Sequence, residues 1–152
     1  MLHEVSFKSF NERDMVQGWV YVPACEPKGI IQLVHGFGEH SRRYLHMIVA
    51  FMDAGFIVAA DDHVGHGKTA VVNGTWGDWG TKGAHTMMED EHKLTEHVKG
   101  MYPGLRDTKN SLVQMYQGVF VKRLMVNYLI SPLLTRSRKY FTRQVYCAGS
   151  FA

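Results

Sequence analysis

The chain has little cysteine and proline, no long apolar run, and no histidine in its last third. Its two cysteines, Cys25 and Cys147, lie far apart and in no metal-binding spacing, so we expect unreactive free thiols and no disulfide framework. No stretch of about 18 uncharged apolar residues occurs, so no membrane-spanning helix is predicted. The first residues lack a basic start followed by an apolar stretch, so we also expect no signal peptide and a cytoplasmic protein.

What is present is typical of a globular protein whose charge is unevenly distributed. Hydrophobic residues make up 45% of the chain and charged residues 20%, with a mean hydropathy of −0.18, which suits one domain with a modest core. Residues 1–104 hold nine Lys or Arg against thirteen Asp or Glu, whereas residues 105–152 hold eight against one, for a total of +3. We therefore predict a boundary near Leu105, between residues 1–105 and a basic tail of residues 106–152.

Hydrophobic patterning predicts an α/β fold class. Residues 5–7 and 16–22 are predicted to form a β-hairpin around a polar turn, and the apolar runs 30–34 and 56–60 are predicted strands buried on both faces. Two helices are expected, one from an N-cap at Ser41 to a terminating Gly55, and one over residues 84–100. This order predicts the opening of a parallel sheet covered by helices. Such a fold needs another buried strand next, and the polar residues 106–111 do not supply it, so we expect an uncovered sheet edge.

Two motifs follow the two buried strands. The first runs from His35 to Tyr44 as His-Gly-Phe-Gly-Glu-His-Ser-Arg-Arg-Tyr, and the second runs from Asp62 to Thr69 as Asp-His-Val-Gly-His-Gly-Lys-Thr. A strand that ends in His-Gly-x-Gly and turns into a helix presents bare backbone N–H groups at the helix start. Such a loop can bind a developing oxyanion during acyl transfer.

These motifs, in this order, resemble the N-terminal portion of the α/β-hydrolase superfamily over about residues 3–105. The most similar group contains monoacylglycerol lipases, lysophospholipases and serine aminopeptidases. The resemblance implies hydrolysis of lipid-like or small esters through an acyl-enzyme, without a cofactor. It implies that the backbone N–H of Phe37 is an oxyanion donor in the loop with His35, Gly36 and Gly38. It also implies structural roles for a second set of motif residues: Glu39, His40, Asp62, His63, Gly65, His66 and Gly67.

The chain departs from that family at the catalytic residues. No serine has glycine two residues before and two residues after it, Asp107 is the only acid beyond residue 104, and no histidine follows His97. We therefore assign no catalytic triad and predict an incomplete hydrolase that is inactive alone. A reading-frame shift or a deletion near Leu105 would account for all of these absences and for the change in composition.

Two other interpretations concern metals and the tail. Asp61, Asp62, His63 and His66 are ligand types, but their spacing matches no standard zinc pattern, so we assign no metal. The apolar-rich residues 113–134, interrupted and followed by lysine and arginine, resemble a basic amphipathic segment. The alternative function is therefore a non-enzymatic protein that binds an anionic membrane surface or a partner groove, with no role for nucleic acid. No particular oligomeric state is predicted.

Overall fold

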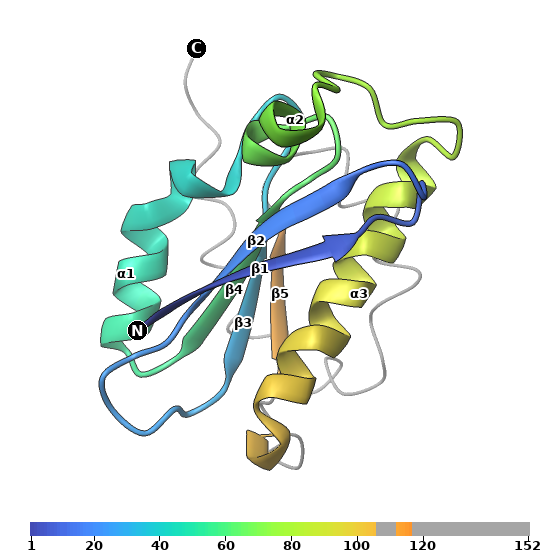
Figure 1. Cartoon of the computed structure of the whole chain (residues 1–152). Helices are drawn as coiled ribbons and strands as arrows, with labels where there is room; N and C mark the ends of the chain where they lie inside the picture. The colour runs from blue at the N-terminus through green and yellow to red at the C-terminus, as the bar shows by residue number, and fades with distance from the viewer. Residues whose placement is uncertain (106–111, 117–152) are drawn as a thin grey trace, which may run out of the picture.

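The computed structural model describes residues 1–105 and the backbone of residues 112–116 (Figure 1). Its five-stranded sheet has the order β1-β2-β4-β3-β5. The strands are β1 (Leu2–Lys8), β2 (Met15–Tyr21), β3 (Ile30–Val34), β4 (Ile57–Asp62) and β5 (Leu112–Tyr116). The helices are α1 (Leu45–Asp53), α2 (Gly67–Asn73) and α3 (Ala84–Met101), with short 3₁₀ turns at Ser41–Tyr44 and Pro103–Leu105. In residues 1–105 no helix is both long and apolar enough to cross a bilayer.

The predicted hairpin is confirmed. β1 and β2 pair antiparallel from Leu2 opposite Tyr21 to Lys8 opposite Met15, and β2 then pairs antiparallel with β4. β4 runs parallel to β3, which is buried along its whole length as the apolar pattern predicted. Two parallel strands therefore lie at the centre of the sheet and end at the same edge.

The core has one layer on each face of the sheet, with α1 and α3 on opposite sides (Figure 1). Alternation along β4 sends Ile57 and Ala59 to the layer under α3, and Val58 and Ala60 to the layer under α1. Ile48 of α1 is buried in its layer, and three partly buried neighbours pack there too: Tyr44, Phe51 and Met52. In α3, the buried residues Leu94 and Val98 pack in the layer on the other face. The two core layers hold β3 and β4 in place, and both motifs follow the carboxyl ends of these strands.

Three details of the predicted elements are wrong. Ser41 is not a helix cap: the 3₁₀ turn has His40 at its N-cap, α1 begins only at Leu45, and the Ser41 hydroxyl donates to Asp62 instead. The second buried strand does not stop at Ala60 but continues through Asp62. The short helix α2 was not predicted at all. The predicted end of the first helix is confirmed, because Gly55 has φ +89° and its N–H donates to Met52 O at 2.9 Å.

The expectation of an uncovered sheet edge is also wrong. β5 pairs in parallel with β3, from Ile30 opposite Leu112 to Val34 opposite Tyr116. The polar residues 106–111 precede this strand, and the apolar-rich signal of the strand lies in the segment that the charge pattern assigns to the tail. Residues 117–152 lie outside the described residues, so the binding role and the origin of the tail stay predictions.

Candidate functional site

The two motifs meet at the carboxyl ends of β3 and β4. His35 follows β3 and His63 follows β4, and the residues after two parallel neighbours lie at the same sheet edge. The backbone N–H of His63 donates to His35 Nε2 at 3.0 Å, and His63 Nε2 lies 3.2 Å from the carbonyl oxygen of His35. The two rings stack with centroids 3.8 Å apart. These paired contacts clamp the start of the first motif to the end of β4.

The hydrogen bonds of His35 determine its tautomer. Its Nε2 accepts a backbone N–H and so carries no proton, and its Nδ1 lies 2.8 Å from the carbonyl oxygen of Gly36, which can only accept. The ring is therefore neutral, with its proton on Nδ1. Burial, with the nearby His63 as a second cause, lowers the pKa of His35 to about 3.

We expect the His35 ring to stay neutral when the protein is acidified. In an NMR titration its ring signals should not move between about pH 8 and pH 4, because protonating Nε2 would break the bond from His63 and charge a buried ring. Free histidine added to the sample provides the reference transition. A His35 transition centred near pH 6.5 would contradict the buried neutral ring.

The backbone N–H groups of the loop after His35 differ in whether they have a hydrogen-bond acceptor. The N–H of Gly36 donates to Glu39 Oε2 at 3.3 Å, and the N–H of Gly38 donates to His66 Nε2 at 3.1 Å. Between them, the N–H of Phe37 has no hydrogen-bond partner among the residues that the structure describes. The Phe37 side chain is 75% exposed. The loop therefore offers one available backbone donor, flanked by two donors that hold the loop in place.

The partners of these two flanking donors are themselves fixed. Glu39 Oε2 also accepts the hydroxyl of Tyr44, and Glu39 Oε1 lies 3.8 Å from Arg43 Nε. His66 is buried, and since its Nε2 accepts from Gly38, its Nδ1 must donate to the carbonyl oxygen of Val64 at 3.0 Å. Burial lowers the pKa of His66, in agreement with a neutral ring. Each motif thus contributes one acceptor that shapes the loop.

Asp62 ties three segments together from a buried position. Its Oδ1 accepts the backbone N–H of Ser41 at 2.8 Å and the Ser41 hydroxyl at 2.7 Å. Its Oδ2 accepts the backbone N–H of Lys68 at 2.7 Å, in the first turn of α2. The carboxylate therefore joins the end of β4 to the turn before α1 and to the start of α2.

Glycine is required beside this carboxylate. Gly67 has φ +46°, and a Cβ there would collide with Asp62 Oδ2. Gly65 has φ +77°, and its Cβ would lie 3.0 Å from the backbone nitrogen of Asp78. His40, the remaining motif residue, is exposed and supplies the carbonyl oxygen that accepts the Arg43 N–H at 3.2 Å. The second motif therefore packs backbone against buried polar groups, where side chains would not fit.

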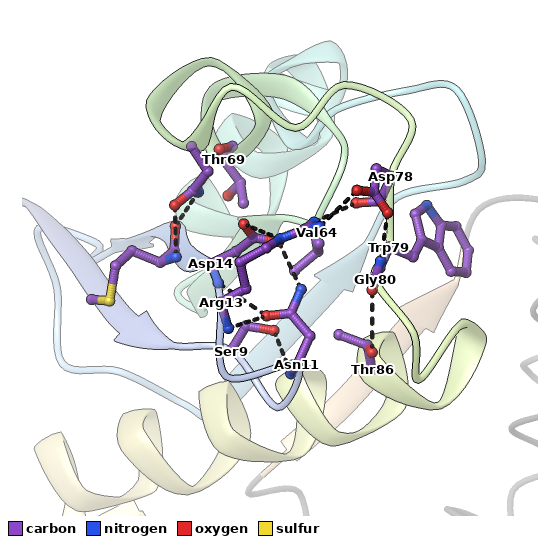
Figure 2. Close-up of polar contacts among 12 residues, drawn as sticks. Ser9, Asn11, Arg13, Asp14, Val64, Thr69, Asp78, Trp79, Gly80 and Thr86 are labelled. Atoms are coloured by element: carbon purple, nitrogen blue, oxygen red, sulfur yellow. Dashed lines mark hydrogen bonds and ion pairs between the residues drawn. The ribbon is translucent and has the colours of Figure 1, made fainter.

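The turn between β1 and β2 contacts the segment that carries Asp78 and Trp79 (Figure 2). Arg13 Nη1 donates to Asp78 Oδ2 at 2.6 Å, and Arg13 Nη2 donates to Asp14 Oδ2 at 2.9 Å. The bond to Asp78, with a second from Arg13 Nη2 to the carbonyl oxygen of Asp78 at 3.2 Å, ties the β1–β2 turn to the segment between α2 and α3. Trp79 of that segment has its ring centroid 5.8 Å from that of His66 and 5.9 Å from that of Phe37. The contact between Arg13 and Asp78 therefore helps to hold the Trp79 ring beside the ring of Phe37.

A buried polar cluster lies beneath the loop, and it joins Asp61 and His63 of the predicted set to Glu91, which the sequence did not connect with them. Asp61, His63 and Glu91 are buried, and one potential ligand atom from each lies within 4.8 Å of the others, a spacing that could suit a metal ion. Gln32 donates to both the carbonyl oxygen and the carboxyl group of Glu91. Two signals could have found this cluster. Gln32 is the one polar residue in the apolar run 30–34, and Glu91 lies three residues before Leu94 and seven before Val98, on the buried face of α3.

The sheet order and the His-Gly-x-Gly loop at the end of β3 place the protein in the α/β-hydrolase class. The family model described as "Serine aminopeptidase, S33" matches residues 25–109, which is more than half of the chain. The chain belongs to this family.

Relatives and solved structures agree with that assignment. The chain is 44% identical over 50 residues to a monoacylglycerol lipase of Mycolicibacterium smegmatis, covering 33% of this chain and 18% of the relative. It is 34% identical over 83 residues to human monoglyceride lipase, covering 55% of this chain and 26% of the relative. The chain thus spans less than a third of each of these relatives.

Two solved structures share the fold at 44% sequence identity or more. A thermostable carboxyl esterase from Bacillus coagulans, solved in complex with glycerol, is 58% identical with a TM-score of 0.67, over 76% of this chain and 35% of the esterase. A lipase in its open form is 44% identical with a TM-score of 0.72, over 78% of this chain and 36% of the lipase. The chain is therefore related to serine ester hydrolases and matches about a third of their structures.

Proposed function

We propose that residues 1–105 supply the oxyanion-binding half of a serine ester hydrolase site, with the backbone N–H of Phe37 as the donor. The observation that carries the proposal is the free N–H of Phe37 between two engaged neighbours. A fixed backbone donor of this kind stabilises charge that develops on a carbonyl oxygen in the transition state. The donor belongs to the main chain, so an exposed phenylalanine side chain is compatible with the role.

The proposed substrates are carboxylic esters with lipid-like or small acyl groups. This choice rests on the relatives, which include monoglyceride lipases and a carboxyl esterase. Acyl transfer of this type needs a nucleophile, a base and backbone donors, and so the proposal includes no cofactor.

We further propose that the 152 residues do not turn over esters on their own. They contain no G-x-S-x-G turn and no histidine after His97, so the nucleophile and the general base of the family triad would come from a further polypeptide segment. Without a nucleophile to attack the ester carbonyl, no oxyanion forms, and the backbone donor alone does not catalyse hydrolysis.

The test uses the purified chain with a fluorophosphonate probe and a chromogenic short-chain ester. We expect labelling and turnover at the level of a buffer blank, while the Bacillus coagulans esterase, as the positive control, labels stoichiometrically. Addition of a separately expressed C-terminal segment of that esterase should restore labelling if the oxyanion half is intact. Stoichiometric labelling and saturable turnover by the chain alone would refute its proposed inactivity.

A further inference from the structure

The buried cluster beneath the loop is unbalanced if both of its acids are ionised. Asp61 and Glu91 are completely buried, and both oxygens of Asp61, Glu91 Oε1 and His63 Nδ1 then have no hydrogen-bond partner among the described residues. Buried carboxylates without donors are costly, and two in contact repel each other. The cluster therefore needs hydrogen between its polar atoms.

One proton on Glu91 resolves the repulsion. Glu91 Oε2 already accepts from Gln32 Nε2, an amide nitrogen that can only donate, so Oε1 is the oxygen left to carry a proton. One carboxyl oxygen of Glu91 lies within 4.8 Å of one of Asp61, and neither Asp61 oxygen nor Glu91 Oε1 has a hydrogen-bond donor among the described residues, so ionising both acids would be costly. Burial and the charge of Asp61 raise the pKa of Glu91, in agreement with a proton on Glu91 Oε1.

The second proton belongs to His63. Its Nε2 faces the carbonyl oxygen of His35 and must donate, while its Nδ1 lies 3.3 Å from Glu91 Oε1 and 3.6 Å from Asp61 Oδ1. Burial opposes a charged ring, but the Asp61 carboxylate outweighs it and raises the pKa of His63. A neutral Glu91, a charged Asp61 and a charged His63 then sum to zero inside the protein.

The surrounding titratable groups leave this balance intact. His35, stacked on His63, is neutral for the reasons given above. Asp90, the neighbour of Glu91 on α3, is turned toward the hairpin, where it accepts from the Ser9 hydroxyl and the Phe10 N–H at 2.6 Å each. Asp62 is bound by Ser41 and Lys68. No other described cation has an ion-pair contact with Asp61 or Glu91.

We infer that the buried cluster positions the loop: with Glu91 uncharged, the Asp61 carboxylate keeps His63 protonated, and His63 thereby holds the loop that begins at His35. The inference rests on the proposed function for its catalytic meaning, because that loop carries the Phe37 donor. Helix α3 would then help to hold the loop that carries Phe37 through buried contacts. These contacts run from Glu91 to His63, and from His63 to the backbone of His35.

Infrared difference spectroscopy on the full chain tests the protonation. Near pH 7 the wild type should show the C=O stretching band of a protonated carboxylic acid, and Glu91→Gln should lose it, whereas the control Glu89→Gln, at a partly exposed acid of α3, should keep it. Absence of the band from the wild type, or one equivalent of tightly bound divalent metal in its place, would overturn the inference.

NMR on the same variants tests the positioning. The ring ¹⁵N shifts of His63 should report a charged ring in the wild type and in Glu91→Gln, whose side chain is likewise uncharged, and a neutral ring in Asp61→Asn. Exchange of the His63 backbone amide, which binds His35, should be about tenfold faster in Asp61→Asn and within about twofold of wild type in Glu91→Gln.

Two outcomes separate this role from mere stability and from the hydrolase proposal. If Asp61→Asn accelerates exchange equally at core amides such as that of Val58, the cluster only stabilises the fold and the positioning role is refuted. None of these readouts needs ester turnover, so a failure of the proposed hydrolase function would leave the infrared and NMR results unchanged.

Discussion

Replacing Asp62 with alanine is expected to lower the free energy of unfolding by about 3–5 kcal/mol. The substitution removes the acceptor of three short hydrogen bonds and leaves two backbone N–H groups, those of Ser41 and Lys68, without their partner. A hydrogen bond to a charged group contributes about 1.5–3 kcal/mol, and an unpaired buried donor adds its own desolvation cost. Few single substitutions in this chain would disconnect as many segments, since Asp62 joins β4 to the turn before α1 and to α2.

Urea unfolding followed by circular dichroism measures this loss. Asp53→Ala is the matched control, because Asp53 is an exposed aspartate at the end of α1, and its effect should stay within about 0.5 kcal/mol. Asp62→Asn should fall between the two, since its amide oxygen, placed as Oδ1, can still accept both bonds from Ser41, whereas the bond from the Lys68 N–H is lost. An Asp62→Ala loss no larger than that of the control would mean that the carboxylate does not hold these segments.

The elements that the sequence predicted are those whose signal is local and repeated. The apolar run 30–34 predicts a buried strand, and the spacing of Leu94 and Val98 predicts the buried face of a helix. Both patterns are local, because a buried strand or helix face is mostly apolar along its length. The hairpin was equally readable, since two apolar runs flank a polar turn. In these segments local preference and tertiary packing favour the same structure.

The missed elements depend on partners that are distant in sequence. α2 has only seven residues, which is too short for an amphipathic pattern to predict it. In its first turn the N–H of Lys68 donates to Asp62, a contact that the sequence does not show. Ser41 has the chemistry of a cap, but the buried carboxylate of Asp62 offers its hydroxyl a stronger acceptor. β5 follows a polar segment, and its pairing with β3 depends on contacts about 80 residues apart in the chain.

The candidate site was predictable only in part for the same reason. The two motifs and the family that they resemble pointed to His35, Phe37 and His66, because both motifs directly follow buried strands. The sequence alone did not connect Glu91 with Asp61, since a carboxylate on a helix usually faces solvent. Only the packing of α3 over the sheet places that side chain against His63.

Removing the Phe37 N–H should cost about 10²- to 10³-fold in kcat once a complete site is present. The experiment joins residues 1–105 of this chain to the matching C-terminal portion of the Bacillus coagulans esterase, whose 58% identity favours a compatible interface. In this chimera, Phe37→Pro replaces the donor with a residue that has no N–H. The loss should fall on kcat more than on KM, because the donor acts on charge that exists only in the transition state.

Phe37→Ala in the same chimera isolates the backbone contribution from the side chain. It keeps the N–H and removes an exposed ring, so its kcat should stay within about threefold of the parent chimera, apart from small changes through the ring contacts with His66 and Trp79. Circular dichroism and unfolding curves for all three proteins show whether the proline variant remains folded. Equal kcat values for a folded Phe37→Pro and the parent chimera would place the oxyanion donor elsewhere. Neither the ring nor the N–H of residue 37 would then contribute to kcat, against the geometry in which Gly36 and Gly38 are engaged and the Phe37 N–H is free.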